Sequence, residues 1–243
     1  WLPMQPDPYA RYDLGDLASL FRLETRIVGR SKQLDLEASL KDALDPLAAG
    51  IAFRDGPLAD PARTMMGGVQ EQWLAEGLAR STTAGTKWQI LAQQTIMSPT
   101  IMPRDYRAWY KPDAPPSESK KAELELAVKL GELGISPHTD RWDGYPAARR
   151  RLLAASRAAS AELVVLSGDS HNAWAFDLEH EGLPVGVEFA GHSVSSLGMD
   201  KRYFGDPSAI ARSFTDTNPN LKWCDTSRRG YMVLDITPET VTN

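Results

Sequence analysis

The chain has 243 residues, of which 42% are hydrophobic and 24% charged, and its net charge is −5. This composition is ordinary for a water-soluble globular protein with a sizeable core, and the negative charge argues against general binding to nucleic acid, which needs a basic face. No apolar run approaches the roughly 18 residues of a membrane span, and the single cysteine, Cys224, excludes an internal disulfide.

The first half of the chain alternates between strand and helix patterns. Because it begins at Trp1, with no signal peptide, we expect a processed or truncated piece. The proline-containing residues 1–12 are expected to be irregular. The periodicity of apolar residues predicts a strand over 20–27, a helix from 34 to about 44 with Asp35 as its cap, a helix over 65–81 and a buried strand over 88–92.

The second half continues this alternation after a proline-rich surface excursion over 98–117. We expect helices over 117–134 and 145–159, the second with Pro146 in its first turn. Strands are predicted over 163–166, 184–191 and 230–237. Alternating helices and strands indicate an α/β or α+β protein with layered sheets.

One strand end carries residues with metal-binding chemistry. The apolar run 163–166 stops at Ser167-Gly168 and is followed by Asp169 and His171. A carboxylate is a hard oxygen ligand and neutral imidazole a borderline nitrogen ligand. If extended geometry continues, positions i and i+2 face the same side, and the pair could approach two metal ions about 4 Å apart. Gly168 would let the backbone turn tightly.

The same spacing has a structural alternative. Asp169 could cap a turn, and His171 could be a hydrogen-bonded core histidine. Two ligands alone do not make a metal site.

Six segments of the chain resemble one family in the same order. The segment LSGDSHNAWAFDL (166–178) is similar to the last motif of calcineurin-like metallophosphoesterases, in the Gly-Asp-x-His form of the alkaline phosphatase D family. The others are YDLGDLASLFRLETR, with Glu24 where Asp is usual, RTMMGGVQEQWL, KWQILAQQTIMSP, DRWDGYPAARRRLL, and the closing GVEFAGHSVSSLG with NPNLKWCDTSRRGYMVLDIT. The resemblance runs from about Tyr9 to Thr242.

This resemblance implies a layered αββα sandwich with mixed sheets, of which residues 1–243 are the C-terminal part of one catalytic domain. It implies metal-dependent hydrolysis of phosphate esters, in which a metal-bound hydroxide attacks phosphorus. Two metal ions are expected, iron and calcium, with other divalent ions as alternatives. The family also implies a periplasmic or secreted location.

The N-terminal half of the same domain is an expected partner of this chain. The family takes a Gly-Asp strand end, a bridging Asp and a later Asn or His from that half, and none of these is recognisable here. Asp16, in LGDL, matches a different segment and is not assigned as a ligand. The other expected partner is a small-molecule phosphate ester, whereas no nucleic-acid scaffold and no transmembrane segment are expected.

The resemblance gives Asp169 one metal ion and His171 the other, as catalytic ligands. Further contacts to the substrate or the ligands are expected from residues near the strand ends: Asn172, Trp142, Asp143, Tyr145, Gln94 and His192. Asn172 would orient His171, and His192 would donate a proton or support the ligands.

Each of these further residues has a structural alternative. Gln94 could pair with backbone, Asp143 could cap a helix, and His192 could lie in a hydrogen-bonded turn. Arg26 and Arg63 could bind phosphate or pair with carboxylates.

Two other functions stay open at this point. One is a phospholipase D-like phosphodiesterase on the same fold. The other is a non-catalytic relic that serves as a binding or structural module, for which Glu24 in place of Asp is a small hint.

Overall fold

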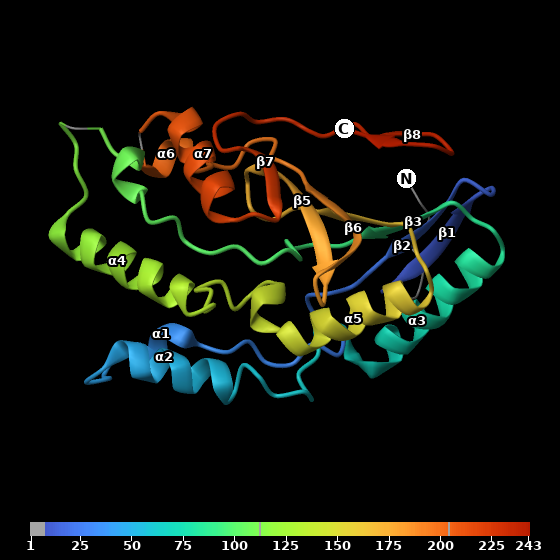
Figure 1. Cartoon of the computed structure of the whole chain (residues 1–243), viewed down its shortest axis with the longest axis horizontal. Helices are drawn as coiled ribbons and strands as arrows, with labels where there is room; N and C mark the ends of the chain where they lie inside the picture. The colour runs from blue at the N-terminus through green and yellow to red at the C-terminus, as the bar shows by residue number, and fades with distance from the viewer. Residues whose placement is uncertain (1–7, 112, 204) are drawn as a thin grey trace.

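A seven-stranded mixed sheet forms the centre of the computed structural model, which describes residues 8–111, 113–203 and 205–243 (Figure 1). The strand order is β1-β2-β3-β4-β6-β5-β7. The strands are β1 (Ala10–Leu14), β2 (Ala18–Arg22), β3 (Trp88–Ala92), β4 (Leu163–Ser167), β5 (Ala173–His180), β6 (Leu183–Ala190) and β7 (Leu221–Asp225).

The middle of this sheet is parallel. Strands β2, β3, β4 and β6 run in one direction, while β1, β5 and β7 pair antiparallel with their neighbours. Parallel strands are buried on both faces and therefore read as continuous apolar runs, as Leu163–Leu166 does. The α/β class and the mixed sheet expected from the sequence are confirmed.

Helices α3 (Gly67–Thr83) and α5 (Pro146–Ala158) lie along one face of the sheet (Figure 1). Phe21, Leu91 and Val165 point to this face and pack with residues of α3 and α5 in the largest core cluster. A second cluster on the same face packs Trp174 and Phe176 against Phe214 of α7. The helices are α1 (Leu36–Leu40), α2 (Pro46–Asp55), α3 (Gly67–Thr83), α4 (Glu118–Glu132), α5 (Pro146–Ala158), α6 (Asp200–Tyr203) and α7 (Pro207–Thr217), with 3-10 turns η1 (Tyr106–Trp109) and η2 (Trp142–Gly144).

The opposite face of the sheet, here called the bare face, has a much thinner cover. Its central residues Ala18, Ile90 and Val164 form an apolar cluster whose cover, within the described residues, comes from the C-terminal segment 234–241. That segment contains the two-stranded sheet of β8 (Asp235–Ile236) and β9 (Val241–Thr242). The indole Nε1 of Trp88 fastens it by donating to the Thr237 carbonyl at 2.7 Å.

Several sequence expectations about elements were wrong. The strand expected over 20–27 ends at Arg22, and Ile27 is 83% exposed. The reason is local, because the Glu24 carboxylate accepts hydrogen bonds from the amides of Arg26, Ile27 and Val28 and so closes a turn. Those hydrogen bonds lower the pKa of Glu24 against the opposing effect of burial.

At the two ends of the chain, the expected boundaries also differ. Ala10–Leu14 is a strand although 1–12 was expected to be irregular, and residues 1–7 lie outside the described residues. The strand expected over 230–237 shrinks to Asp235–Ile236.

The helix expected from 34 is two helices. Asp35 caps α1 by accepting from the Ala38 amide, as predicted. Asp45 then caps α2, in which Pro46 occupies the first turn. Together with α4 these helices enclose a satellite apolar cluster around Phe53 and Ile135.

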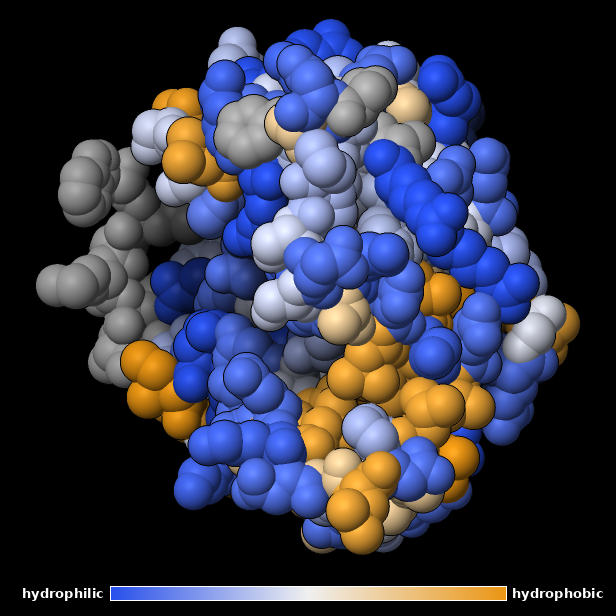
Figure 2. Space-filling model, turned by 90° about the vertical axis from the view of Figure 1, so that its left-hand side faces the viewer, coloured by the Kyte–Doolittle hydropathy of each residue, from blue (hydrophilic) through white to orange (hydrophobic). Residues whose placement is uncertain are grey.

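Figure 2 shows apolar residues gathered on the lower part of the side of the molecule that carries these helices. None of the helices in the described part of the chain has the length and apolarity needed to cross a membrane.

Candidate active site

The carboxyl ends of the parallel strands β3 and β4 meet at one edge of the sheet, which is the usual place for a ligand in an α/β fold. A shallow depression of about 500 Å³ lies there, lined by Ala92, Gln93, Gln94, Leu166, Ser167, Gly168 and Asp169. A larger depression of about 830 Å³ lies at the amino ends of the same strands, around Leu163 and Gly186. The chemistry of Asp169 and His171 places the candidate site at the carboxyl edge.

Asp169 and His171 are both exposed, and both adopt a left-handed backbone conformation. Their φ angles are +67° and +64°. The expectation that extended geometry continues past β4 was therefore wrong, because the strand ends at Ser167 and a turn follows. The left-handed region costs a residue other than glycine on the order of 1 kcal/mol. Such strain at two polar side chains that are separated by one residue is typical of a functional turn.

Gly168 does not have the role expected from the sequence. It is not among the residues with positive φ. An added Cβ would meet only the Gln94 carbonyl oxygen, at an ordinary 3.8 Å. The tight part of the turn lies at Asp169 and His171 instead.

We accordingly expect Gly168→Ala to change the free energy of unfolding by less than about 0.5 kcal/mol, as measured by urea denaturation. Gly67→Ala is the contrasting variant, because Gly67 has a φ of +77° and its Cβ would lie 3.0 Å from the Gly29 Cα. It should destabilise by more than about 1 kcal/mol. A large loss with Gly168→Ala would contradict the geometry of the turn.

The imidazole of His171 is held in one orientation. Its Nδ1 lies 2.9 Å from the carbonyl oxygen of Leu197. Because a carbonyl oxygen can only accept, Nδ1 carries the proton, and the lone pair of the neutral ring is on Nε2. This is the arrangement that a metal-ligating histidine has when its second nitrogen is fixed by the backbone.

Asn172 fastens the loop 193–199, which contains Leu197, to the turn with Asp169 and His171. Its Oδ1 accepts from the Met199 amide at 3.1 Å, and its Nδ2 donates to the Ser170 carbonyl at 2.9 Å. A Cβ on Gly198 would lie 2.6 Å from Asn172 Oδ1, so the loop approaches closely only because residue 198 is glycine. Asn172 is buried, and it contacts the loop whose Leu197 carbonyl accepts from His171.

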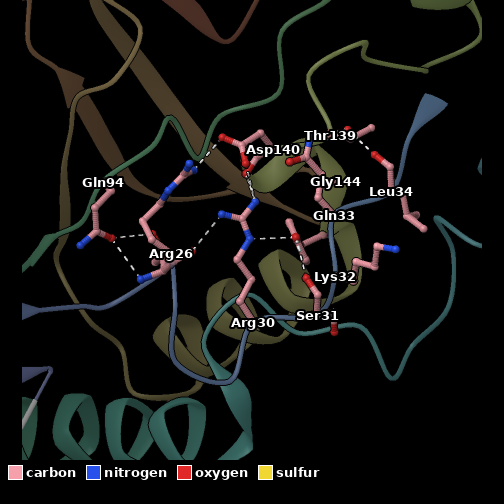
Figure 3. A network of polar contacts seen from close by, with 12 residues as sticks. Arg26, Arg30, Ser31, Lys32, Gln33, Leu34, Gln94, Thr139, Asp140 and Gly144 are labelled. Carbon is pink, nitrogen blue, oxygen red and sulfur yellow. Dashed lines mark hydrogen bonds and ion pairs between the residues drawn. The ribbon is translucent and has the colours of Figure 1, made fainter. Parts of the chain in front are cut away.

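Gln94 uses its side chain to hold another segment of the chain. Its Oε1 accepts from the amide and the hydroxyl of Thr25 (Figure 3). Its Nε2 donates to the Leu23 carbonyl at 3.1 Å. Its main-chain carbonyl accepts from the Gly168 amide at 3.3 Å. The residue lines the depression, but its amide group is paired with backbone, as in the structural alternative.

The arginines considered for phosphate binding are paired within the chain. Arg26 and Arg30 flank the Asp140 carboxylate at 2.7 and 2.8 Å, which joins the segment after β2 to the loop before η2 (Figure 3). Arg63 donates to the carbonyls of Lys32 and Gly144.

The Trp-Asp-Gly-Tyr segment is part of the core and does not line the depression. Trp142 and Tyr145 are fully buried. The Trp142 Nε1 donates to Gln93 Oε1 at 3.1 Å, and the Tyr145 hydroxyl donates to the Ser31 carbonyl at 2.9 Å. The Asp143 side chain is 6% exposed and pairs with Arg141 at 2.6 Å. The structure thus gives these three residues packing partners where the sequence predicted substrate contacts.

His192 follows β6, beside the end of β4. The adjacent Gly191 donates its amide to the Ser167 carbonyl at 2.9 Å. His192 lines a depression of about 550 Å³ together with Phe189, Trp223 and Tyr231. Its Nδ1 is buried and makes no hydrogen bond within the described residues.

The ligand set within the described residues is incomplete. In the ranges 8–111, 113–203 and 205–243, no group of three or more His, Cys, Asp or Glu side chains is arranged to hold a metal ion. Asp169 and His171 fit a metal ion by their donor atoms, their exposure and the fixed imidazole. Two side chains alone do not fill the coordination of a metal ion.

Two features near the site were missed from the sequence. The loop 193–199, which supplies the Leu197 and Met199 contacts, carries no pattern that reveals them. Glu188, buried within β6, does have a signal, because it is a charged residue in the middle of an apolar strand.

The seven-stranded mixed sheet with its helices has the fold of an α/β domain of the metallophosphoesterase type. The family model for "PhoD-like phosphatase" matches residues 1–243. The chain therefore belongs to the PhoD-like phosphatase family, which is metal-dependent in general.

Two relatives support this assignment. The chain is 30% identical to "Alkaline phosphatase D" of Bacillus subtilis (strain 168) over 248 residues, which cover 98% of this chain and 34% of the relative. A solved structure titled "Structure of PhoD" matches with a TM-score of 0.60 at 25% identity, over 95% of this chain and 36% of that one. The chain thus spans about a third of the length of each relative.

Proposed function

We propose that this chain carries one side of the metal site of a phosphate-ester hydrolase, with Asp169 as a ligand to one cation and His171 as a ligand to a second. The observation that carries the proposal is the turn itself. Two exposed side chains with metal-binding donors are held in left-handed backbone conformations, and the Leu197 carbonyl leaves the imidazole Nε2 available. Family membership supports the reaction class.

The residues of this chain bind and orient. Asp169 and His171 project from the turn, Asn172 fastens the loop that fixes the imidazole, and Gln94 holds the segment after β2 against the depression. His192 lies beside the strand end, and its buried Nδ1 has no hydrogen-bond partner among the described residues, so it is our candidate for proton transfer to the leaving group. When bound, the cations supply charge stabilisation to the phosphoryl oxygens and lower the pKa of water. On family resemblance they are iron and calcium.

The remaining ligands are assigned to an N-terminal half of the same domain. Two ligands cannot fill the coordination of two cations, and the described residues offer no third of their kind at the site. On the bare face, the apolar cluster of Ala18, Ile90 and Val164 is covered by the thin C-terminal segment 234–241, as expected of a face that packs against further structure. The proposed substrate is a small-molecule phosphate ester, and the proposed location, again on resemblance, is the periplasm or the cell exterior.

The test uses the intact protein, meaning this chain together with the proposed N-terminal half of the domain. Its metal content and its hydrolysis of phosphate esters are measured. We expect about two metal ions per molecule and hydrolysis of p-nitrophenyl phosphate or its bis ester that stops after chelation and returns on adding metal. The mono- and diester rates separate a phosphatase from a phosphodiesterase. An intact protein with no metal and no hydrolysis would instead be a non-catalytic relic.

A further inference from the structure

Glu188 is an acidic side chain buried inside the sheet, close to the candidate site. It lies on β6, between the apolar residues Val187 and Phe189, and is fully buried. It points to the face of the sheet that the helices cover, since its two neighbours belong to the cluster on the bare face. Burial of a carboxylate costs several kcal/mol unless hydrogen bonds or charges compensate it.

Three hydrogen bonds provide this compensation, and they come from two other segments. The amides of Met97 and Ser98 donate to Glu188 at 2.7 Å each, one to each carboxylate oxygen. The hydroxyl of Ser167 donates to Oε1, also at 2.7 Å. The carboxylate therefore joins β6 to the last residue of β4 and to the loop that follows β3.

The charge of Glu188 is balanced only in part. Burial raises the pKa of Glu188, and the hydrogen bonds from Met97, Ser167 and Ser98 oppose this effect. Arg149 of α5, which donates to the Met97 carbonyl at 3.2 Å, contributes an attractive charge.

Both segments that Glu188 contacts adjoin the turn with Asp169 and His171. Ser167 precedes Asp169 by two residues. The loop 93–98, which Glu188 holds through Met97 and Ser98, also carries Gln94, whose carbonyl accepts from the Gly168 amide. Glu188 therefore fixes the incoming strand of the turn and the loop against which the turn rests.

We propose that Glu188 is a positioning residue for the metal-binding turn, acting through the Ser167 hydroxyl and the Met97–Ser98 amides to set where Asp169 and His171 lie. The inference rests on the proposed function, because it assigns those two side chains to metal ions. It goes further in naming a buried residue on a different strand as the support of the turn. A side chain that only filled the core would be apolar at this position, because an apolar residue of similar volume carries no desolvation cost.

The test is titration of the metal-free intact protein with Mn²⁺, followed by electron paramagnetic resonance. Ser167→Ala removes only the hydroxyl contact and leaves Glu188 with its two amide donors. We expect Mn²⁺ to bind about tenfold more weakly to this variant, the lower end of the effect of losing an outer contact to a ligand. Ser167→Thr keeps the hydroxyl and should bind like the unchanged protein. Glu188→Gln, which exchanges one acceptor oxygen for an NH₂ donor, should weaken Mn²⁺ binding at least as much.

A control separates positioning from stability. Asn218 is equally buried and clamps the main chain of Ile101, away from the turn. Asn218→Ala should lower the melting temperature without changing the Mn²⁺ affinity. The inference is overturned if Ser167→Ala binds Mn²⁺ as tightly as the unchanged protein, and this outcome counts even if Glu188→Gln fails to fold.

The same titration reports separately on the proposed function. Asp169→Asn and His171→Ala should each lower the number of bound Mn²⁺ ions from about two to about one, because each residue is proposed to bind a separate ion. Loss of one ion in these two variants, together with unchanged binding in Ser167→Ala, would contradict the positioning role alone. An unchanged protein that does not bind Mn²⁺ would sink both.

Discussion

Replacing His171 by alanine in the intact protein is expected to lower kcat/KM for phosphate-ester hydrolysis by about 10²- to 10³-fold. A metal ligand supports several kcal/mol of transition-state charge stabilisation, and each 1.36 kcal/mol is about a factor of ten in rate. The metal content should fall from about two ions per molecule to about one. The measurements are steady-state hydrolysis of p-nitrophenyl phosphate and elemental analysis of the purified variant.

His180→Ala is the matched control for this prediction. His180 ends β5 and pairs across the sheet with Leu183, at the opposite end of the strand from Ala173. Its removal should leave both the rate and the metal content unchanged. Full activity and two bound metals in the His171 variant would show that the imidazole is not a ligand.

Replacing Gly144 by alanine is expected to destabilise the fold by about 3 kcal/mol or more, the upper range for overpacking. A Cβ at this position would lie 1.9 Å from the carbonyl oxygen of Thr139 and 2.6 Å from its carbon. These are backbone atoms, so no side-chain rotation relieves the clash. Urea or guanidinium unfolding of the purified variant measures the loss, and failure to accumulate in folded form is its extreme.

Gly68→Ala is the control for the Gly144 variant. Gly68 lies in the first turn of α3 with open space around it, so its Cβ meets nothing within 4 Å. Alanine should leave the stability unchanged or raise it by up to about 1 kcal/mol, because alanine is the better helix former. If Gly144→Ala and Gly68→Ala had equal free energies of unfolding, residues 139 and 144 would not approach as closely as the structure shows.

The strands that the sequence predicted well are the central parallel strands. Residues 88–92 match β3, the expected 163–166 ends one residue before β4 does, and the expected 184–191 is shifted by one residue at both ends from β6. Continuous apolar runs produce this agreement. The runs at the sheet edges were harder, because β1 is half-exposed and follows three prolines.

Strand β5 was missed although its signal is present. Trp174, Phe176 and Leu178 alternate with more exposed residues and are all buried. Conversely, the alternation over 230–237 predicted a strand, but Tyr231 is 81% exposed and Val233 60%. Alternation alone does not show whether a face is covered.

The sequence located the candidate ligands but not their geometry. The residue types at 169 and 171 indicate metal chemistry, but neither is a glycine, so nothing in the sequence marks a left-handed turn. The Trp-Asp-Gly-Tyr segment was predicted to contact substrate. In the structure, its residues pack around Gly144, whose backbone closely approaches Thr139. Resemblance to a family segment does not distinguish a binding residue from one that holds a close backbone approach.

At positions 169 and 171, the left-handed turn lowers the stability of the fold, while the side chains there supply the proposed metal-binding atoms. Glycine at 169 or 171 would relieve the backbone cost and abolish a donor atom. Selection for robustness alone would drift towards such replacements, whereas selection for the bound ions would oppose them. In homologues that no longer need the activity, we expect substitutions at 169 and 171 to appear before substitutions in the apolar interior of the sheet.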